Sequence, residues 1–192
     1  MKLSNKYVNR ILSNICKIYE IVNWIFAGLA VLLIIYSTLN YEFVEHILTD
    51  GYAELIFKTP TIAALYDNIS GEINMFSVYI NYIYAVIEAI LKALVFRNVD
   101  LILATMSKEH NDTENYSPFQ KSVVKRVKTI GILFIASPVL DLVVDIILHF
   151  SSDIHPRITG DMYALTLGLV CLCLAHIFSY GAKLEDEVDG LL

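Results

Sequence analysis

The sequence predicts an all-α integral membrane protein, a four-helix bundle with cytoplasmic helical extensions of its second and third spans. The first observation is composition: 56% of the residues are hydrophobic and 18% are charged, which is too apolar for an ordinary soluble domain. The second is distribution, because the apolar residues gather in four blocks of roughly 20 residues, enough to cross about 30 Å of hydrocarbon. A single transmembrane domain is therefore expected over residues 1–192.

The first predicted span is the clearest of the four. It contains no charge, and Trp24 and Tyr36 lie near its two ends, where aromatic rings favour the membrane interface. The other three blocks are slightly longer and carry strongly polar or charged residues inside them. The predicted spans are residues 21–39, 75–96, 129–150 and 162–182.

Basic residues near the spans predict the orientation, since Lys and Arg are retained on the cytoplasmic side. They concentrate in the N-terminal arm, in the loop of residues 97–128 and, as Lys183, in the tail of residues 183–192. Both termini are therefore expected in the cytoplasm. Residues 40–72 form an outer loop whose one basic residue, Lys58, stands against six acids: Glu42, Glu45, Asp50, Glu54, Asp67 and Glu72.

The cytoplasmic loop predicts the two helical extensions, which would form an antiparallel stalk. Span two is expected to continue through Arg97 to about Met106. A second helix is expected to begin at Ser117 and to run unbroken into span three. A capping serine, Pro118 at the first helical position and Gln120 suit such a start.

Ionisable residues inside a bilayer are costly, so each needs a partner or a purpose. Glu88 and Lys92 of span two lie four residues apart and are expected to pair along one helix. Asp141, Asp145 and His149 of span three follow one another at spacings of four, which puts them on one stripe.

The stripe on span three cannot face lipid. It faces either the bundle interior, with tyrosines of span two and His176 of span four as partners, or a water-filled cleft. Three roles stay open for it: a polar network that fixes helix packing, a proton or cation relay, or a ligand pocket.

Enzyme motifs are missing from the sequence. There is no HExxH run, no GxSxG turn, no phosphate-binding Gly loop and no Cys/His cluster, so no catalytic residue, metal or other cofactor is predicted. Cys171 and Cys173 would point about 200° apart on a helix, which suits packing. The basic loop favours contact with the bilayer over direct nucleic-acid binding, because acids are interleaved with its lysines. A homo-oligomer stays open.

Two segments, residues 116–131 and 178–192, resemble the signature regions of a bacterial family of four-span membrane proteins, domain of unknown function 2975. The resemblance implies a bacterial cytoplasmic membrane and supplies no catalytic residues. Members are often encoded beside a small helix-turn-helix regulator, which implies a membrane partner in regulation or in immunity to a membrane-active peptide. The long acidic outer loop departs from the family pattern. The matching residues are Pro118, Phe119, Ile130, Gly131, Gly181, Leu184, Glu187 and Asp189.

Opposite charges predict that the tail docks against the start of span three. The tail's Glu185, Glu187 and Asp189 are expected to attract a basic cluster of Lys121, Lys125, Arg126 and Lys128.

The first hypothesis is thus a non-enzymatic membrane protein that senses or neutralises an extracellular peptide, or tethers a cytoplasmic regulator. The alternative is a small proton- or cation-coupled transporter that uses Glu88, Asp141 and Asp145.

Overall fold

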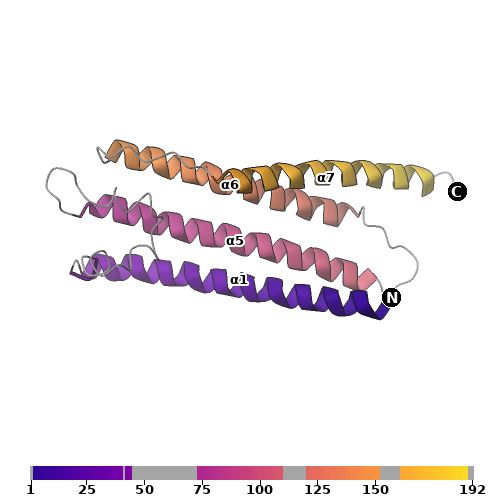
Figure 1. Ribbon diagram of the computed structural model, residues 1–192, viewed down its shortest axis with the longest axis horizontal. Coiled ribbons are helices and arrows are strands. Elements are labelled where there is room, and N and C mark those ends of the chain that lie inside the picture. Colours follow the sequence, from indigo (N-terminus) through magenta and orange to yellow (C-terminus); the bar gives the residue numbers. More distant parts are fainter. Residues whose placement is uncertain (1, 41, 45–72, 110–119, 152–160, 190–192) are drawn as a thin grey trace. The chain divides into compact units, whose positions relative to one another are not determined.

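The chain folds into four long helices, shown by a computed structural model that describes residues 2–40, 42–44, 73–109, 120–151 and 161–189. Each helix contains one predicted span, and each is long and apolar enough to cross a membrane. The all-α class is confirmed, the helices are consistent with the predicted four-helix bundle, and the chain is a multi-pass membrane protein. The helices are α1 (Lys2–Leu39), α5 (Met75–Glu109), α6 (Lys121–Ser151) and α7 (Met162–Asp189) (Figure 1).

Two helix starts differ from the sequence prediction. α1 begins at Lys2, so the N-terminal arm is helical and continuous with span one. α6 begins at Lys121, and the predicted start at Ser117 is wrong for the continuous helix because Gln120 is not helical. The carbonyl of Gln120 accepts the first helical hydrogen bond, from the Val124 N–H at 3.0 Å, so Gln120 stands at the cap position. Residue 117 itself lies outside the described residues.

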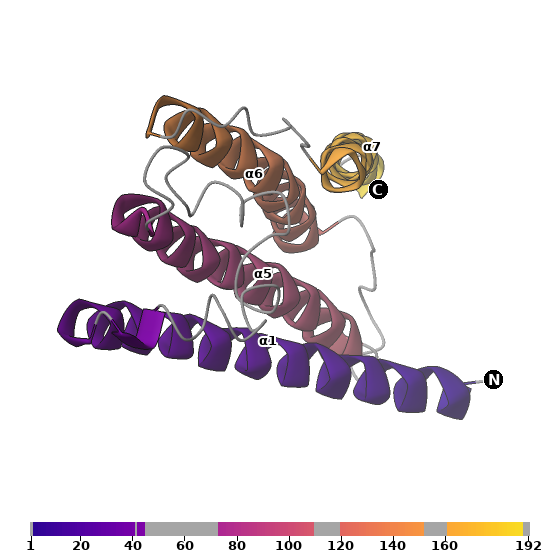
Figure 2. The ribbon, with the colours of Figure 1, turned by 60° about the vertical axis from the view of Figure 1, so that its left-hand side comes forward.

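The chain divides into two compact units. The first unit consists of Met1–Val22, Leu91–Ser137 and Met162–Leu192, and the second of Asn23–Ile90 and Pro138–Asp161. α1, α5 and α6 therefore contribute to both units, whereas α7 belongs to the first. Within each unit α1 lies beside α5 (Figures 1 and 2).

In the first unit, α6 and α7 approach closely at two glycines. A Cβ atom added at Gly168 would lie 2.7 Å from Cγ1 of Ile135 and 2.9 Å from the carbonyl oxygen of Gly131. Small residues let membrane helices approach at backbone distance, where van der Waals contact holds them together. Gly131 and Gly168 thus make a glycine crossing, in which a larger residue at position 168 would clash with the backbone of α6.

The second unit has two apolar clusters. In one, Tyr82 and Val78 of α5 pack with Val44, and Leu33 and Ile34 of α1 lie against them. In the other, Tyr84 of α5 packs with Val144 and Leu148 of α6. The Ser37 hydroxyl of α1 donates to the Tyr82 hydroxyl at 3.4 Å, so a polar contact accompanies the packing of α1 on α5.

Large apolar side chains also cover the outside of the helices. Ile25, Leu32, Leu167 and Ile177 are each about half exposed or more, and Phe150 is 85% exposed. Such a surface would aggregate in water and suits lipid.

Candidate functional site

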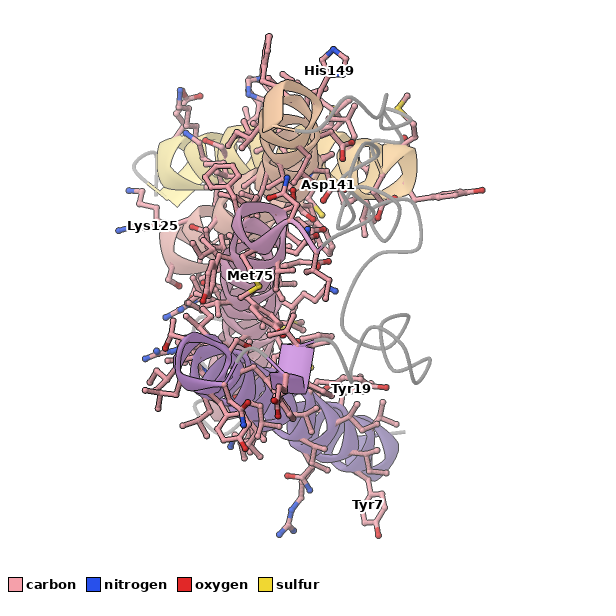
Figure 3. All side chains as sticks on the ribbon, turned by 90° about the vertical axis from the view of Figure 1, so that its left-hand side faces the viewer. Tyr7, Tyr19, Met75, Lys125, Asp141 and His149 are labelled. Carbon is pink, nitrogen blue, oxygen red and sulfur yellow. The ribbon has the colours of Figure 1, made fainter. Side chains whose placement is uncertain are left out.

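A buried carboxylate joins α5 to α6 in the second unit. The Tyr84 hydroxyl donates a hydrogen bond to Oδ1 of Asp141 at 2.5 Å, and both residues are buried. Asp141 lies on the side of α6 that faces α5 (Figure 3). The bond is set among apolar side chains, since Tyr84 also packs on Val144 and Leu148. A hydroxyl-to-carboxylate bond in such a place is shielded from competing water.

On α5, Tyr84 belongs to a row of polar residues. Ser77, Asn81, Tyr84 and Glu88 follow at spacings of four, three and four, which places them on one side of the helix. The first three are buried and Glu88 is half-buried, and Glu88 also interacts with the Tyr84 hydroxyl. These four residues, together with Asp141 and Asp145 of α6, are called the polar face below.

The predicted stripe on span three passes from buried to exposed along α6. Asp141 is buried, Asp145 is half-buried and His149 is exposed, with its ring edge-on to Phe150 at a centroid distance of 5.7 Å. The stripe therefore contributes its deepest carboxylate to the contact with α5, while His149 lies at the surface (Figure 3).

The other two predicted intramembrane residues are exposed and belong to the first unit: Lys92 of α5 and His176 of α7. The Glu88–Lys92 pair and a role for His176 beside the stripe stay predictions.

The basic start of α6 presents its charges to the surroundings. Lys121, Lys125 and Lys128 are exposed, and the Lys125 side chain points away from the helices (Figure 3). Arg126 is half-buried, and its Nε has no hydrogen-bond partner among the described residues. In the tail Glu187 is exposed, whereas the side chains of Glu185 and Asp189 lie outside the described set. Docking of the tail on this basic cluster stays a prediction.

A second buried carboxylate, absent from the predicted site residues, joins α1 to α5 in the first unit. Oδ1 of Asp100 accepts a hydrogen bond from the Ser13 hydroxyl at 2.5 Å, and Oδ2 lies 4.0 Å from Nζ of Lys17. Nearby on the same two helices, the Tyr19 ring stacks on Phe96 with centroids 5.0 Å apart. These five residues are called the arm clamp.

The arm clamp left a signal in the sequence. Ser13 and Lys17 lie four apart, and Ile11, Leu12 and Ile15 recur around them at the spacings of an amphipathic helix. A helical arm follows from that pattern, whereas its partner on α5 does not.

Metal-ligating side chains do not gather in the part of the chain that the structure describes. No group of three or more His, Cys, Asp or Glu side chains is arranged there to hold a metal ion. Cys16 is buried, Cys171 half-buried and Cys173 exposed, and all three are free thiols. No protein-family model, curated protein or solved structure matches the chain.

Proposed function

We propose that this chain is a non-enzymatic protein of the bacterial cytoplasmic membrane, with both termini inside, that tethers a small cytoplasmic regulator through its N-terminal arm. The arm clamp carries the proposal, because it makes the charged end of α1 an ordered surface. The orientation rests on the basic residues of the arm and of the loop of residues 97–128. The regulator class follows from the family resemblance. Recognition of an extracellular peptide by residues 40–72 stays a prediction, since residues 45–72 lie outside the described set.

Helix length indicates that the arm projects beyond the hydrocarbon. The apolar part of α1 runs from Tyr7 to Leu39, 33 residues, whereas a span with an ordinary tilt of about 20° needs roughly 21. About a dozen residues must therefore lie outside the core, at the end that carries Arg10 and Lys17. A helix of this kind is stable in water only when it packs on something. The arm clamp supplies that packing against α5.

The exposed side of the arm suits a protein partner. Tyr7 is 71% exposed and points away from the helices (Figure 3), and Ile18 is 60% exposed. Arg10 and Lys17 are exposed along the same segment. Exposed aromatic and aliphatic side chains bordered by basic ones form a patch that a partner with an apolar groove and an acidic rim would cover.

Photo-crosslinking in living cells tests the tether. A photoreactive amino acid is placed at Tyr7 or Ile18 of the full chain, and at the 89% exposed Tyr163 of α7 as a control. We expect one adduct with a small cytoplasmic protein from the two arm positions, identified by mass spectrometry as a helix-turn-helix regulator. The control should not form it, and Asp100→Ala should reduce it several-fold. Adducts with lipid alone, or the same adduct at Tyr163, would contradict the proposal.

One observation favours the alternative, a proton- or cation-coupled transporter. The Tyr84 hydroxyl lies between two intramembrane carboxylates, donating to Asp141 and interacting with Glu88. Polar chains of this type mark ion pathways in membrane proteins. Purified protein in proteoliposomes would show ion-coupled flux that Asp141→Asn abolishes, whereas a purely structural Asp141 would leave no flux to lose.

A further inference from the structure

Ser77 has a fully buried hydroxyl without a partner. Its exposure is 0%, and Oγ makes no hydrogen bond among the described residues. The backbone around it is satisfied, because the Ser77 N–H donates to Oδ1 of Asn74 and its carbonyl accepts from Nδ2 of Asn81. A buried polar atom of this kind is costly, all the more so in a membrane span, unless it meets a water or an ion.

The unpartnered hydroxyl lies on the polar face. Asn81, one turn along, is 3% exposed and uses its Nδ2 for the Ser77 carbonyl, so its Oδ1 is oriented to accept. The facing segments of α5 and α6 run antiparallel (Figure 1). Asp141 of α6 lies opposite Tyr84 of α5, as their hydrogen bond shows. One turn further along α6, Asp145 is therefore closer than Asp141 to the end of α5 that carries Ser77.

A set of oxygen ligands that includes a single carboxylate suits a small hard cation with one positive charge. Ser77 and Asn81 offer neutral oxygens, and Asp145 offers a half-buried carboxylate. In membrane proteins Na⁺ is held by such oxygens within the span. A divalent ion is disfavoured, because it prefers several carboxylates and no group of three forms among the described residues.

We propose that the polar face binds a monovalent metal cation, Na⁺, through Oγ of Ser77, Oδ1 of Asn81 and the carboxylate of Asp145. The site stands independently of the tether and of transport, since a bound ion can be purely structural.

The test is the thermal stability of the purified full chain in detergent, compared between NaCl and N-methyl-D-glucamine chloride at equal ionic strength. A ligand that binds only the folded state raises the melting temperature, by about 3 to 6 °C at ten times its dissociation constant. We expect a saturable rise with Na⁺ and a smaller one with K⁺. Equal melting temperatures in all salts would mean that Ser77 meets an ordered water only, and would overturn the site.

Two variants and a matched control make the test specific. Ser77→Ala removes an unpartnered oxygen, so the folded protein in N-methyl-D-glucamine should be at least as stable as before, yet the Na⁺ response should vanish. Asp145→Asn should weaken the response at least tenfold in Na⁺ concentration. Ser37→Ala is the control, because Ser37 is equally buried in the same unit but bonds to Tyr82. A Na⁺ response that persists in Ser77→Ala would overturn the proposal.

Discussion

Asp100 and Asp141 are both buried on an interhelical contact, yet their surroundings differ. Each accepts a hydroxyl hydrogen bond at 2.5 Å, from Ser13 and from Tyr84 respectively. Asp100 also has the ammonium group of Lys17, which is 58% exposed, at 4.0 Å. Asp141 instead has a phenol as its donor and Glu88 as the second carboxylate on that phenol.

The difference indicates what each contact can do. A carboxylate that lies beside an exposed ammonium group has its charge balanced locally and joins two helices. Two carboxylates that act on one phenol inside an apolar cluster would be stabilised by a positive charge beside them. We therefore expect the Asp100 contact of the first unit to hold α1 against α5. We expect the Asp141 contact of the second unit to lie beside a bound cation.

Gly168→Ala should have the largest effect on stability. It should disturb the first unit and leave the Na⁺ response of the second unit unchanged. The new methyl group would lie 2.9 Å from the carbonyl oxygen of Gly131, a backbone atom that cannot rotate away. We expect a loss of about 1–3 kcal/mol in the free energy of unfolding, the usual cost of overpacking. The melting temperature in detergent should fall by several degrees, while its Na⁺-dependent rise, a property of the second unit, should persist.

Gly28→Ala is the matched control, because a Cβ atom at Gly28 would meet nothing within 4 Å. It should leave stability unchanged or raise it, since alanine favours helix over glycine by up to about 1 kcal/mol. Equal losses in the two alanine variants would mean that the glycine crossing does not form.

The crossing also bears on membrane depth. In the predicted spans Gly131 lies near the inner end of one and Gly168 near the outer end of the next. Cysteines at Ile135 and Leu172, whose side chains line the crossing, should be joined in native membranes by a short bifunctional thiol reagent in an otherwise cysteine-free chain. The predicted bounds of the two spans, residues 129–150 and 162–182, would then have to be revised. Failure of the reagent to join the two cysteines would contradict the contact.

Removing the Tyr84–Asp141 bond should have a middle-sized effect. A double-mutant cycle of Tyr84→Phe and Asp141→Ala should give a coupling energy of about 0.6–1.7 kcal/mol, the range of hydrogen bonds between membrane helices. The matched cycle of Ser13→Ala and Asp100→Ala should give less, because Lys17 also lies beside Asp100 and remains there when the Ser13 hydroxyl is removed. Chemical unfolding of the purified variants measures both. A larger coupling in the arm would reverse the contrast drawn between the two carboxylates.

The four helices were predictable because membrane spans are recorded directly in the chain, as runs of apolar residues of one length. Residues 75 and 162 begin α5 and α7 as predicted, since a polar or turn-rich stretch precedes each. The start of α6 was misplaced because local capping preference favours Ser117, whereas Gln120, a poor cap by its side chain, stands at the cap position in the structure.

The candidate site was only half predictable. Spacing singled out Asp141 and Glu88, but it could not show that Tyr84 joins them, because that depends on the rotation of α5 against α6. Ser77 carried no signal at all. A serine in a span is ordinary, and only its 0% exposure without a hydrogen bond distinguishes it.

Lys17→Met should have the smallest effect on stability. It tests whether Asp100 needs the positive charge of Lys17. Because Lys17 is 58% exposed, its ion pair with Asp100 is screened, and exposed pairs contribute only about 0.2–1 kcal/mol. Methionine keeps the length and apolar stem of the side chain, so the melting temperature should fall by a degree or so at low salt and by nothing at high salt. Ser13 still donates to Asp100 in this variant, so a loss as large as that of Gly168→Ala would mean that Asp100 depends on its cation. Asp100 and Asp141 would then both depend on a nearby positive charge, and the contrast between them would be lost.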